Sequence, residues 1–178
     1  MSFYAENLHK GLEVTVLLSC PGRYELVAQK PAAKQTGANL ELILEELGLS
    51  RASVAINNAT IDILYKAKDA RTEAMRSDVL SSDNIDRLDQ ELFPDTKVIL
   101  AMGENAYAAA LMLKQRHPEL IVVKGRHPGF SSLNRIKFDS DGKAIAKGSA
   151  NATKLRAKVV AQKILSQTDL FKPKKGGA

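Results

Sequence analysis

Cysteine, histidine and aromatic residues are scarce in this 178-residue chain. Cys20 is the only cysteine, which excludes an internal disulfide and an iron–sulphur cluster held by several thiolates. The three histidines, His9, His117 and His127, share no metal-ligand spacing, so we expect no metal site. We therefore expect a protein that needs no cofactor and works in a reducing cytoplasm.

Long apolar runs are also missing. No stretch approaches the roughly 20 apolar residues that a membrane-crossing helix needs. The first residues, MSFYAENLHKG, carry an acid and lack the apolar core of a secretory signal. We expect no membrane partner. The length fits one domain, which we place at residues 1–171, followed by a basic flexible tail at residues 172–178.

Positive charge exceeds negative charge, with 26 Lys and Arg against 20 Asp and Glu and a net charge of +6. The excess is concentrated from residue 143 onward, where Asp169 is the only acid. Such a basic end predicts contact with phosphates, although a solvated helix face followed by a lysine-rich tail explains the charge equally well. The basic residues are Lys143, Lys147, Lys154, Arg156, Lys158, Lys163, Lys172, Lys174 and Lys175.

Short apolar segments bounded by turn residues predict buried strands, and helical patterns lie between them. Strands that alternate with helices predict a three-layer α/β/α sandwich with a central, mainly parallel four-stranded sheet. We expect strands at 14–19, 53–56, 97–102 and 120–124, helices at 39–49, 72–92, 103–116 and 149–166, and a turn at 139–148.

Ligands bind such sheets beyond the carboxyl ends of the strands, so the loops after the strands are the candidate site. The first loop begins Cys20-Pro21-Gly22 and has neither a Walker nor a dinucleotide-binding pattern. A Pro-Gly turn brings the backbone close to a bound molecule, although it also serves as an ordinary strand exit. We expect the polar stretch up to Thr36 to form one wall of a pocket.

Two further loops carry polar side chains at strand ends. Asn58 follows the second strand, and its amide offers a donor and an acceptor to a base edge; an Asx turn is the structural alternative. His127, followed by Pro128 after the fourth strand, is a candidate donor to developing negative charge. A single histidine at such a position is more often structural than catalytic. A functional role for His127 therefore depends on the order and spacing of all the motifs together.

That order resembles the uracil-DNA glycosylase superfamily over roughly residues 14–165. In the branch most similar to this chain, GEAPG is followed by E, by GRPFVG and by a glycine that opens a helix. Pro21, Gly22, Glu25, Pro31 and Gly37 match that spacing without a gap. Three later motifs also match: Ile56-Asn57-Asn58 at a strand end, ILAMGENA at residues 99–106, and His127-Pro128-Gly129 with the loop through Leu133.

The resemblance implies an enzyme that flips a damaged base out of DNA and hydrolyses its bond to the sugar. Asn58 would read the Watson–Crick edge of the base. A neutral His127 would donate to its O2 as negative charge develops, a contribution of roughly 3–4 kcal/mol. Phe130 or Leu133 would fill the hole left in the duplex. The resemblance also implies that the base is contacted by Pro21, Gly22, Tyr24 and Ala32. The backbone near Ser131 and Arg135 would contact phosphates.

The sequence departs from the family pattern at several positions. Ser19 stands where the family has an acid that activates water; serine orients a water, but losing a general base costs about 10²–10⁴-fold. The sequence does not say whether a residue from elsewhere, such as Glu25 or Asp62, compensates for this loss. Ala32 replaces an aromatic whose stacking is worth roughly 1–3 kcal/mol, unless Tyr24 supplies the ring. The cluster cysteines of the GEAPG-type branch are absent, so the resemblance implies a divergent member.

Three functions remain open. We expect first a monomeric DNA glycosylase that acts on uracil or another deaminated or modified base in single- or double-stranded DNA. The alternative is a catalytically impaired DNA-binding protein of the same fold, which Ser19 and Ala32 favour and Asn58 and His127 oppose. An enzyme acting on free nucleosides or nucleotides is the third, and the lysine-rich end argues against it.

Overall fold

The computed structural model describes residues 2–64 and 73–171, so the tail predicted at 172–178 lies outside the described residues. Within these ranges the strands form a four-stranded, entirely parallel sheet in the order β2-β1-β3-β4. The strands are β1 (Val14–Leu18), β2 (Ala55–Asn58), β3 (Val98–Met102) and β4 (Ile121–Gly125). Their positions confirm the predicted fold class, with boundaries that differ by one or two residues.

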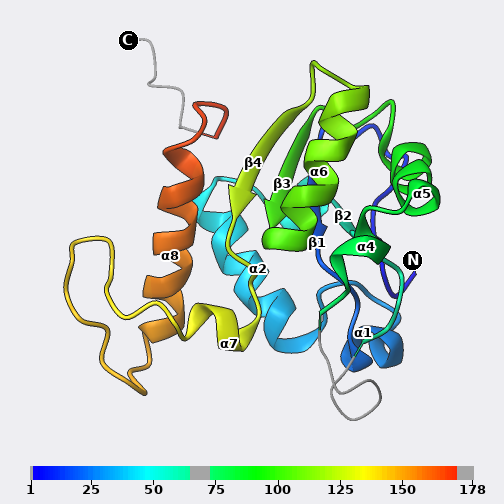
Figure 1. The fold of residues 1–178 in the computed structure, drawn as a ribbon. Helices are drawn as coiled ribbons and strands as arrows, with labels where there is room; N and C mark the ends of the chain where they lie inside the picture. The colour runs from blue at the N-terminus through cyan, green and yellow to red at the C-terminus, as the bar shows by residue number, and fades with distance from the viewer. Residues whose placement is uncertain (1, 65–72, 172–178) are drawn as a thin grey trace.

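Helices cover both faces of the sheet, which completes the predicted sandwich (Figure 1). Helices α2 (Lys34–Glu46) and α8 (Ala152–Leu165) pack together on one face. Helices α5 (Ser82–Leu92) and α6 (Glu104–Arg116) cover the other face. Within the described ranges, no helix is both long and apolar enough to cross a membrane.

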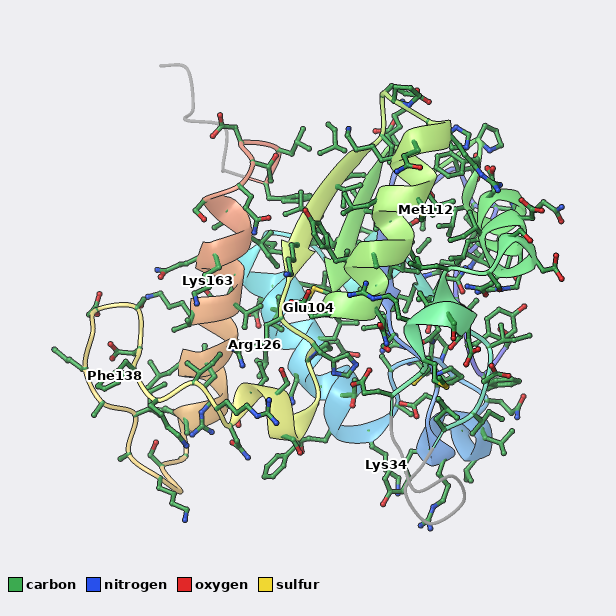
Figure 2. The ribbon with its side chains drawn as sticks, viewed as in Figure 1. Lys34, Glu104, Met112, Arg126, Phe138 and Lys163 are labelled. Atoms are coloured by element: carbon green, nitrogen blue, oxygen red, sulfur yellow. The ribbon has the colours of Figure 1, made fainter. Side chains whose placement is uncertain are left out.

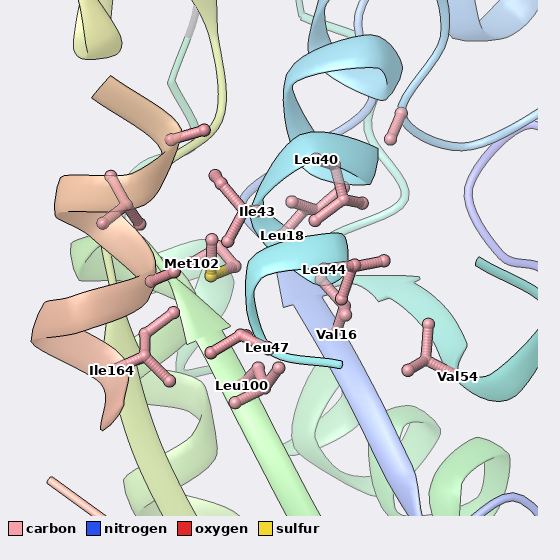
Figure 3. Packing of buried hydrophobic residues seen from close by; sticks show 14 of the residues in the cluster. Val16, Leu18, Leu40, Ile43, Leu44, Leu47, Val54, Leu100, Met102 and Ile164 are labelled. Atoms are coloured by element: carbon pink, nitrogen blue, oxygen red, sulfur yellow. The ribbon is translucent and has the colours of Figure 1, made fainter. Parts of the chain in front are cut away.

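The central strands β1 and β3 are largely apolar because both of their faces are buried under helical layers. Val16 and Leu18 of β1 point toward α2 and α8, whereas Leu17 between them points toward α6. Figure 3 shows Leu44 of α2 and Ile164 of α8 in the first of these layers. Both side chains are almost fully buried, so truncation of either to alanine would cost about 2–5 kcal/mol.

The polar stretch after β1 corrects one sequence expectation. We expected a loop up to Thr36, but it contains the short helix α1 (Arg23–Ala28), and α2 begins at Lys34. None of the α1 residues is buried, so this helix has no apolar periodicity that sequence analysis could detect. Glu25 supports its first turn, because Oε2 accepts a hydrogen bond from the backbone N–H of Gly22 at 2.9 Å.

Three short elements complete the described fold. These are the 3₁₀ turn η1 (Arg51–Ser53), helix α4 (Arg76–Val79) and helix α7 (Phe130–Leu133). One or more helices were predicted over 72–92, and the described part of this range contains two. The chain leaves α4 at Leu80, and the extended backbone of Ser81 begins α5.

Candidate functional site

The site lies at the carboxyl edge of the sheet, where we expected it. A cavity of about 760 Å³, here called the loop cavity, lies against the loop after β1 and the end of β2. A cavity of about 1160 Å³, here called the basic cavity, lies against β4, α7 and α8. Among the described residues, four line both cavities: Ser19, Glu73, His127 and Phe130.

His127 follows β4, and its protonation state is fixed by its surroundings. The backbone N–H of Gly129 donates to its Nδ1 at 3.0 Å. Burial lowers the pKa of the imidazole, an effect that outweighs the opposing charges of Glu73 and Glu25. A neutral imidazole that accepts at Nδ1 carries its proton on Nε2. His127 therefore offers the cavities one neutral N–H donor.

Close packing holds the His127 ring in place. A β-carbon built on Gly129 would lie 2.8 Å from Nδ1 and 3.1 Å from Cε1 of the imidazole. Glycine suits position 129 because a β-carbon there would clash with the ring. The backbone angles do not require glycine, since a φ of −62° suits any residue. The loop thereby gives the imidazole a hydrogen bond from the Gly129 N–H and leaves no room for a β-carbon at residue 129.

Asn58 is the last residue of β2 and lines the loop cavity. Its side-chain Nδ2 donates to the backbone carbonyl of Tyr4 at 2.9 Å. A carbonyl only accepts, so this contact fixes which end of the amide is the oxygen. In the described part of the chain, the buried Oδ1 of Asn58 has no hydrogen-bond partner, although the residue is only 1% exposed. Burying an unpaired acceptor costs about 1–3 kcal/mol, which a bound N–H would recover.

The contact beside Asn58 is not an Asx turn, which would reach the N–H two residues along. Oδ1 of Asn57 accepts from the backbone N–H of the next residue, Asn58, at 2.8 Å. A partly buried network then supports the strand end. Arg87 donates to the carbonyl of Asn58 at 3.1 Å, and Glu91 accepts from Nδ2 of Asn57 at 2.8 Å and from Tyr4 Oη at 3.0 Å. Sequence analysis missed these supports because they come from helix α5 and the N-terminal segment.

Ser19 is buried directly after β1 and hydrogen-bonds to a carboxylate that the sequence did not indicate. Its Oγ donates to Oε2 of Glu73 at 2.9 Å, and Glu73 itself is exposed and lines both cavities. The sequence left open whether a carboxylate such as Glu25 or Asp62 compensates for Ser19. Glu25 is instead engaged by backbone N–H groups, from Gly22 to Oε2 at 2.9 Å and from Ala33 to Oε1 at 3.0 Å.

The wall of the loop cavity contains three of the four residues predicted for it. Gly22, Tyr24 and Ala32 line the cavity, whereas Pro21 is buried and does not. This corrects the assignment of Pro21, which acts through its carbonyl by accepting from the N–H of Leu64 at 3.0 Å. Tyr24 supplies an aromatic ring where Ala32 has none, and Lys34 Nζ lies 4.0 Å from that ring's centroid.

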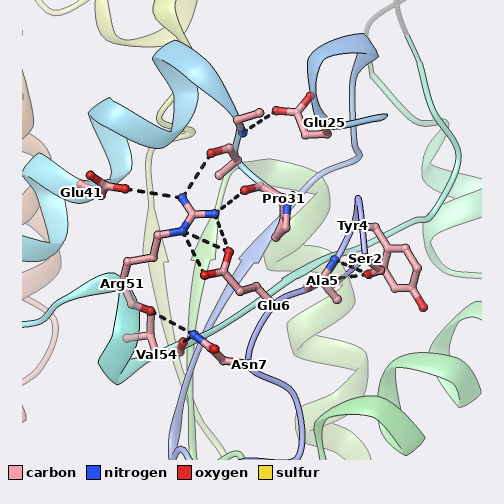
Figure 4. Close-up of polar contacts among 12 residues, drawn as sticks. Ser2, Tyr4, Ala5, Glu6, Asn7, Glu25, Pro31, Glu41, Arg51 and Val54 are labelled. Carbon is pink, nitrogen blue, oxygen red and sulfur yellow. Dashed lines mark hydrogen bonds and ion pairs between the residues drawn. The ribbon is translucent and has the colours of Figure 1, made fainter. Parts of the chain in front are cut away.

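Ala32 is held in a conformation that alanine rarely adopts. Its φ is +46°, a left-handed geometry that costs about 1–3 kcal/mol. Arg51 holds the segment by donating to the carbonyls of Pro31 and Ala32, at 2.5 and 3.2 Å (Figure 4). The guanidinium is in turn paired with Glu6 at 2.8 Å. The wall is therefore a rigid segment with a small side chain at its turning point.

The basic cavity carries cations and an exposed aromatic. Figure 2 labels Lys163 on α8 and Arg126 just beyond β4, and both line this cavity. Ser131 and Arg135, predicted to lie near phosphates, line it as well. Lys124 also lines it, but Glu104 neutralises part of its charge through an ion pair of 2.6 Å. The arrangement is suited to an anionic chain that passes along α7 and α8.

Two predicted DNA contacts have different outcomes. Phe130 is 65% exposed and lines both cavities, so it is available to a ligand. Leu133 is 2% exposed and belongs to the core between α2 and α8, which corrects its assignment to the DNA-facing surface. Arg156 is also buried rather than solvated, because Nε donates to the Ile136 carbonyl at 3.2 Å and NH1 to Asn134 Oδ1 at 2.6 Å.

The structure therefore brings Ser19, Asn58 and His127 together, although they lie on three different strand ends. Within the described residues, no group of three or more His, Cys, Asp or Glu side chains is placed to hold a metal ion. No model of a known protein family matches the sequence, and no curated protein matches it either. The function is consequently inferred from the chemistry of the site itself.

Proposed function

We propose that the protein is a DNA glycosylase, similar to the uracil-DNA glycosylase superfamily, that hydrolyses the N-glycosidic bond of a flipped uracil or related base. One observation carries the proposal. Asn58, whose buried Oδ1 has no hydrogen-bond partner among the described residues, lines the same cavity as His127, whose neutral ring carries an N–H donor at Nε2. These two atoms are what an imide or lactam base needs, since it presents an N–H and a carbonyl oxygen.

The orientation of Asn58 favours uracil and hypoxanthine over cytosine and adenine. Because Nδ2 is held by the carbonyl of Tyr4, Oδ1 is the atom of this amide that is left to accept a hydrogen bond from a ligand. Uracil and hypoxanthine carry a ring N–H at the position where cytosine and adenine have an unprotonated nitrogen. Cytosine or adenine would therefore place two acceptors against each other and leave the Asn58 oxygen unpaired, a cost of about 1–3 kcal/mol.

His127 would supply the stabilisation of the leaving group. When the glycosidic bond breaks, its electron pair passes to the base and negative charge develops on the carbonyl oxygen. A donor already placed where the charge develops stabilises that charge more than it stabilises the neutral base. The lowered pKa of His127 keeps the ring in its neutral form, and the Gly129 hydrogen bond keeps the proton on Nε2.

The basic cavity supports DNA rather than a free nucleoside as the substrate. Lys163, Arg126 and Arg135 line a cavity that shares His127 with the loop cavity, so an anionic backbone and a flipped base would bind side by side. Phe130 lines both cavities and is exposed, which suits a ring that stacks on the remaining bases.

The test is a cleavage assay on labelled oligonucleotides, single- and double-stranded, that carry uracil, hypoxanthine, xanthine or 5-hydroxymethyluracil. Alkali converts each abasic product to a strand break. We expect cleavage by the wild type and a loss of about 10²–10³-fold in His127→Ala. The exposed His9 offers a matched control, His9→Ala, which should cleave at the wild-type rate. Salt-sensitive DNA binding without cleavage of any substrate would instead support the catalytically impaired DNA-binding protein.

A further inference from the structure

Glu73 is a carboxylate placed between the two cavities, and base recognition does not use it. It lines both cavities, and Ser19 Oγ donates to its Oε2 at 2.9 Å. Its negative charge also acts on two neighbouring groups, the imidazole of His127 and the thiol of Cys20. It opposes the lowering of the His127 pKa, and it adds to the effect of burial that raises the pKa of the Cys20 thiol to about 11.

The other carboxylates at the cavities are engaged elsewhere. Besides Glu73, the described residues that line a cavity include two acids, Glu25 and Glu104. Both oxygens of Glu25 accept backbone N–H groups and hold the wall of the loop cavity. Glu104 is paired with Lys124 at 2.6 Å. Glu73 is thus the carboxylate whose position suits proton transfer at the junction of the cavities.

We propose that Glu73 is the general base of the reaction and that Ser19 is the residue that positions it. This inference rests on the proposed glycosylase function. A water oxygen forms a bond to the sugar C1′ and gives a proton to the Glu73 carboxylate. The C1′–N bond breaks, and its electron pair leaves on the base as an anion that His127 stabilises. Glu73 then returns the proton to solvent or to the base, so the products are an abasic sugar and the free base.

The Ser19–Glu73 pair suits these roles because the two side chains differ in burial. Ser19 is 4% exposed and gives its only hydroxyl proton to Glu73, so it holds that carboxylate in place, and the same hydroxyl also makes a hydrogen bond with the Cys20 thiol. Glu73 is exposed and can exchange its proton with solvent after each turnover. Glu73, which lies 54 residues further along the chain, would thereby supply a carboxylate beside Ser19 at the end of β1.

The test compares single-turnover cleavage by Glu73→Gln, Glu73→Ala and Ser19→Ala on the base that the wild type removes best. Glu45→Gln is the matched control, because Glu45 is an exposed carboxylate of α2 that lines neither cavity. We expect Glu73→Gln to lose about 10²–10⁴-fold in rate and Ser19→Ala to lose less. Binding of DNA that contains 2′-fluoro-2′-deoxyuridine should be unchanged in both, since only the proton transfer is affected.

Chemical rescue separates catalysis from positioning. Added formate should restore part of the rate of Glu73→Ala, because a small carboxylate can occupy the vacated space, and should restore nothing in His127→Ala. A wild-type rate in Glu73→Gln would overturn the assignment, as would equal losses in Glu73→Gln and Ser19→Ala without formate rescue. Failure of the wild type to cleave any base would instead refute the proposed function, and the general base with it.

Discussion

Replacing Gly129 with alanine tests whether the ring of His127 is held by its loop. The β-carbon of the new alanine would lie 2.8 Å from Nδ1, about 0.6 Å inside an ordinary contact of 3.4 Å. The backbone at 129 already has a φ of −62°, which alanine adopts without strain. The ring must therefore move, and the hydrogen bond from the N–H of residue 129 to Nδ1 must lengthen or break.

The expected size of the effect follows from that displacement. A misplacement on the order of 1 Å costs about 10²-fold in rate, and full removal of such a donor costs about 10²–10³-fold. For a shift of about 0.6 Å we expect a loss of about 10- to 100-fold in single-turnover cleavage of a uracil-containing duplex. The melting temperature should change little, because no strained backbone is introduced.

Gly148→Ala provides the opposite control. A β-carbon at Gly148 has nothing within 4 Å, but its φ of +80° is one that alanine resists, at about 1–2 kcal/mol. This variant should lose stability and keep the wild-type cleavage rate. The reasoning would be refuted if Gly129→Ala cleaved at the wild-type rate with an unchanged melting temperature, because the ring would then not depend on the Gly129 contact.

Two further predictions concern His127 and the loop after it. Burial lowers the pKa of His127 below its ordinary value of about 6.5, so the unfolded chain binds a proton that the folded protein resists. The free energy of unfolding should therefore fall as the pH drops from about 6.5 toward the lowered pKa, and it should fall less in His127→Gln. Denaturant titrations of both proteins at several pH values measure this free energy. The same dependence of the unfolding free energy on pH in both proteins would contradict the prediction. Phe130→Ala should keep the melting temperature and weaken DNA binding, whereas Leu133→Ala should cost about 2–5 kcal/mol in stability and leave the affinity of the remaining folded protein unchanged.

The sheet and the larger helices could be predicted because each leaves a periodic trace in the sequence. A strand buried on both faces must be apolar throughout, as Val98–Met102 is, and a helix packed on a sheet must repeat its apolar residues every three or four positions, as α2 does. Helix α1 leaves no such trace because it buries none of its residues. The sequence therefore indicated a loop where the structure has a capped helix.

The candidate site was predictable only in part, for a related reason. Asn58 and His127 stand directly after apolar strands, so the parallel sheet brings them to one edge. Glu73 comes from a charged segment without periodicity, and only the hydrogen bond to Ser19 places it at the site. Phe130 and Leu133 are both apolar residues of α7, and packing against α2 and α8 decides which of them is buried.

Three energetic costs in this fold lie at the loop cavity, and they bear on the choice between the two leading functions. Asn58 buries an unpaired acceptor, Ala32 adopts a left-handed backbone, and His127 is kept neutral by burial. Each of the first two costs about 1–3 kcal/mol, and such costs persist where a bound ligand requires them. A protein that only held DNA would need exposed cations and would have no use for a buried acceptor and a neutral donor on two residues that line one cavity. The arrangement therefore favours a pocket preorganised for a flipped base.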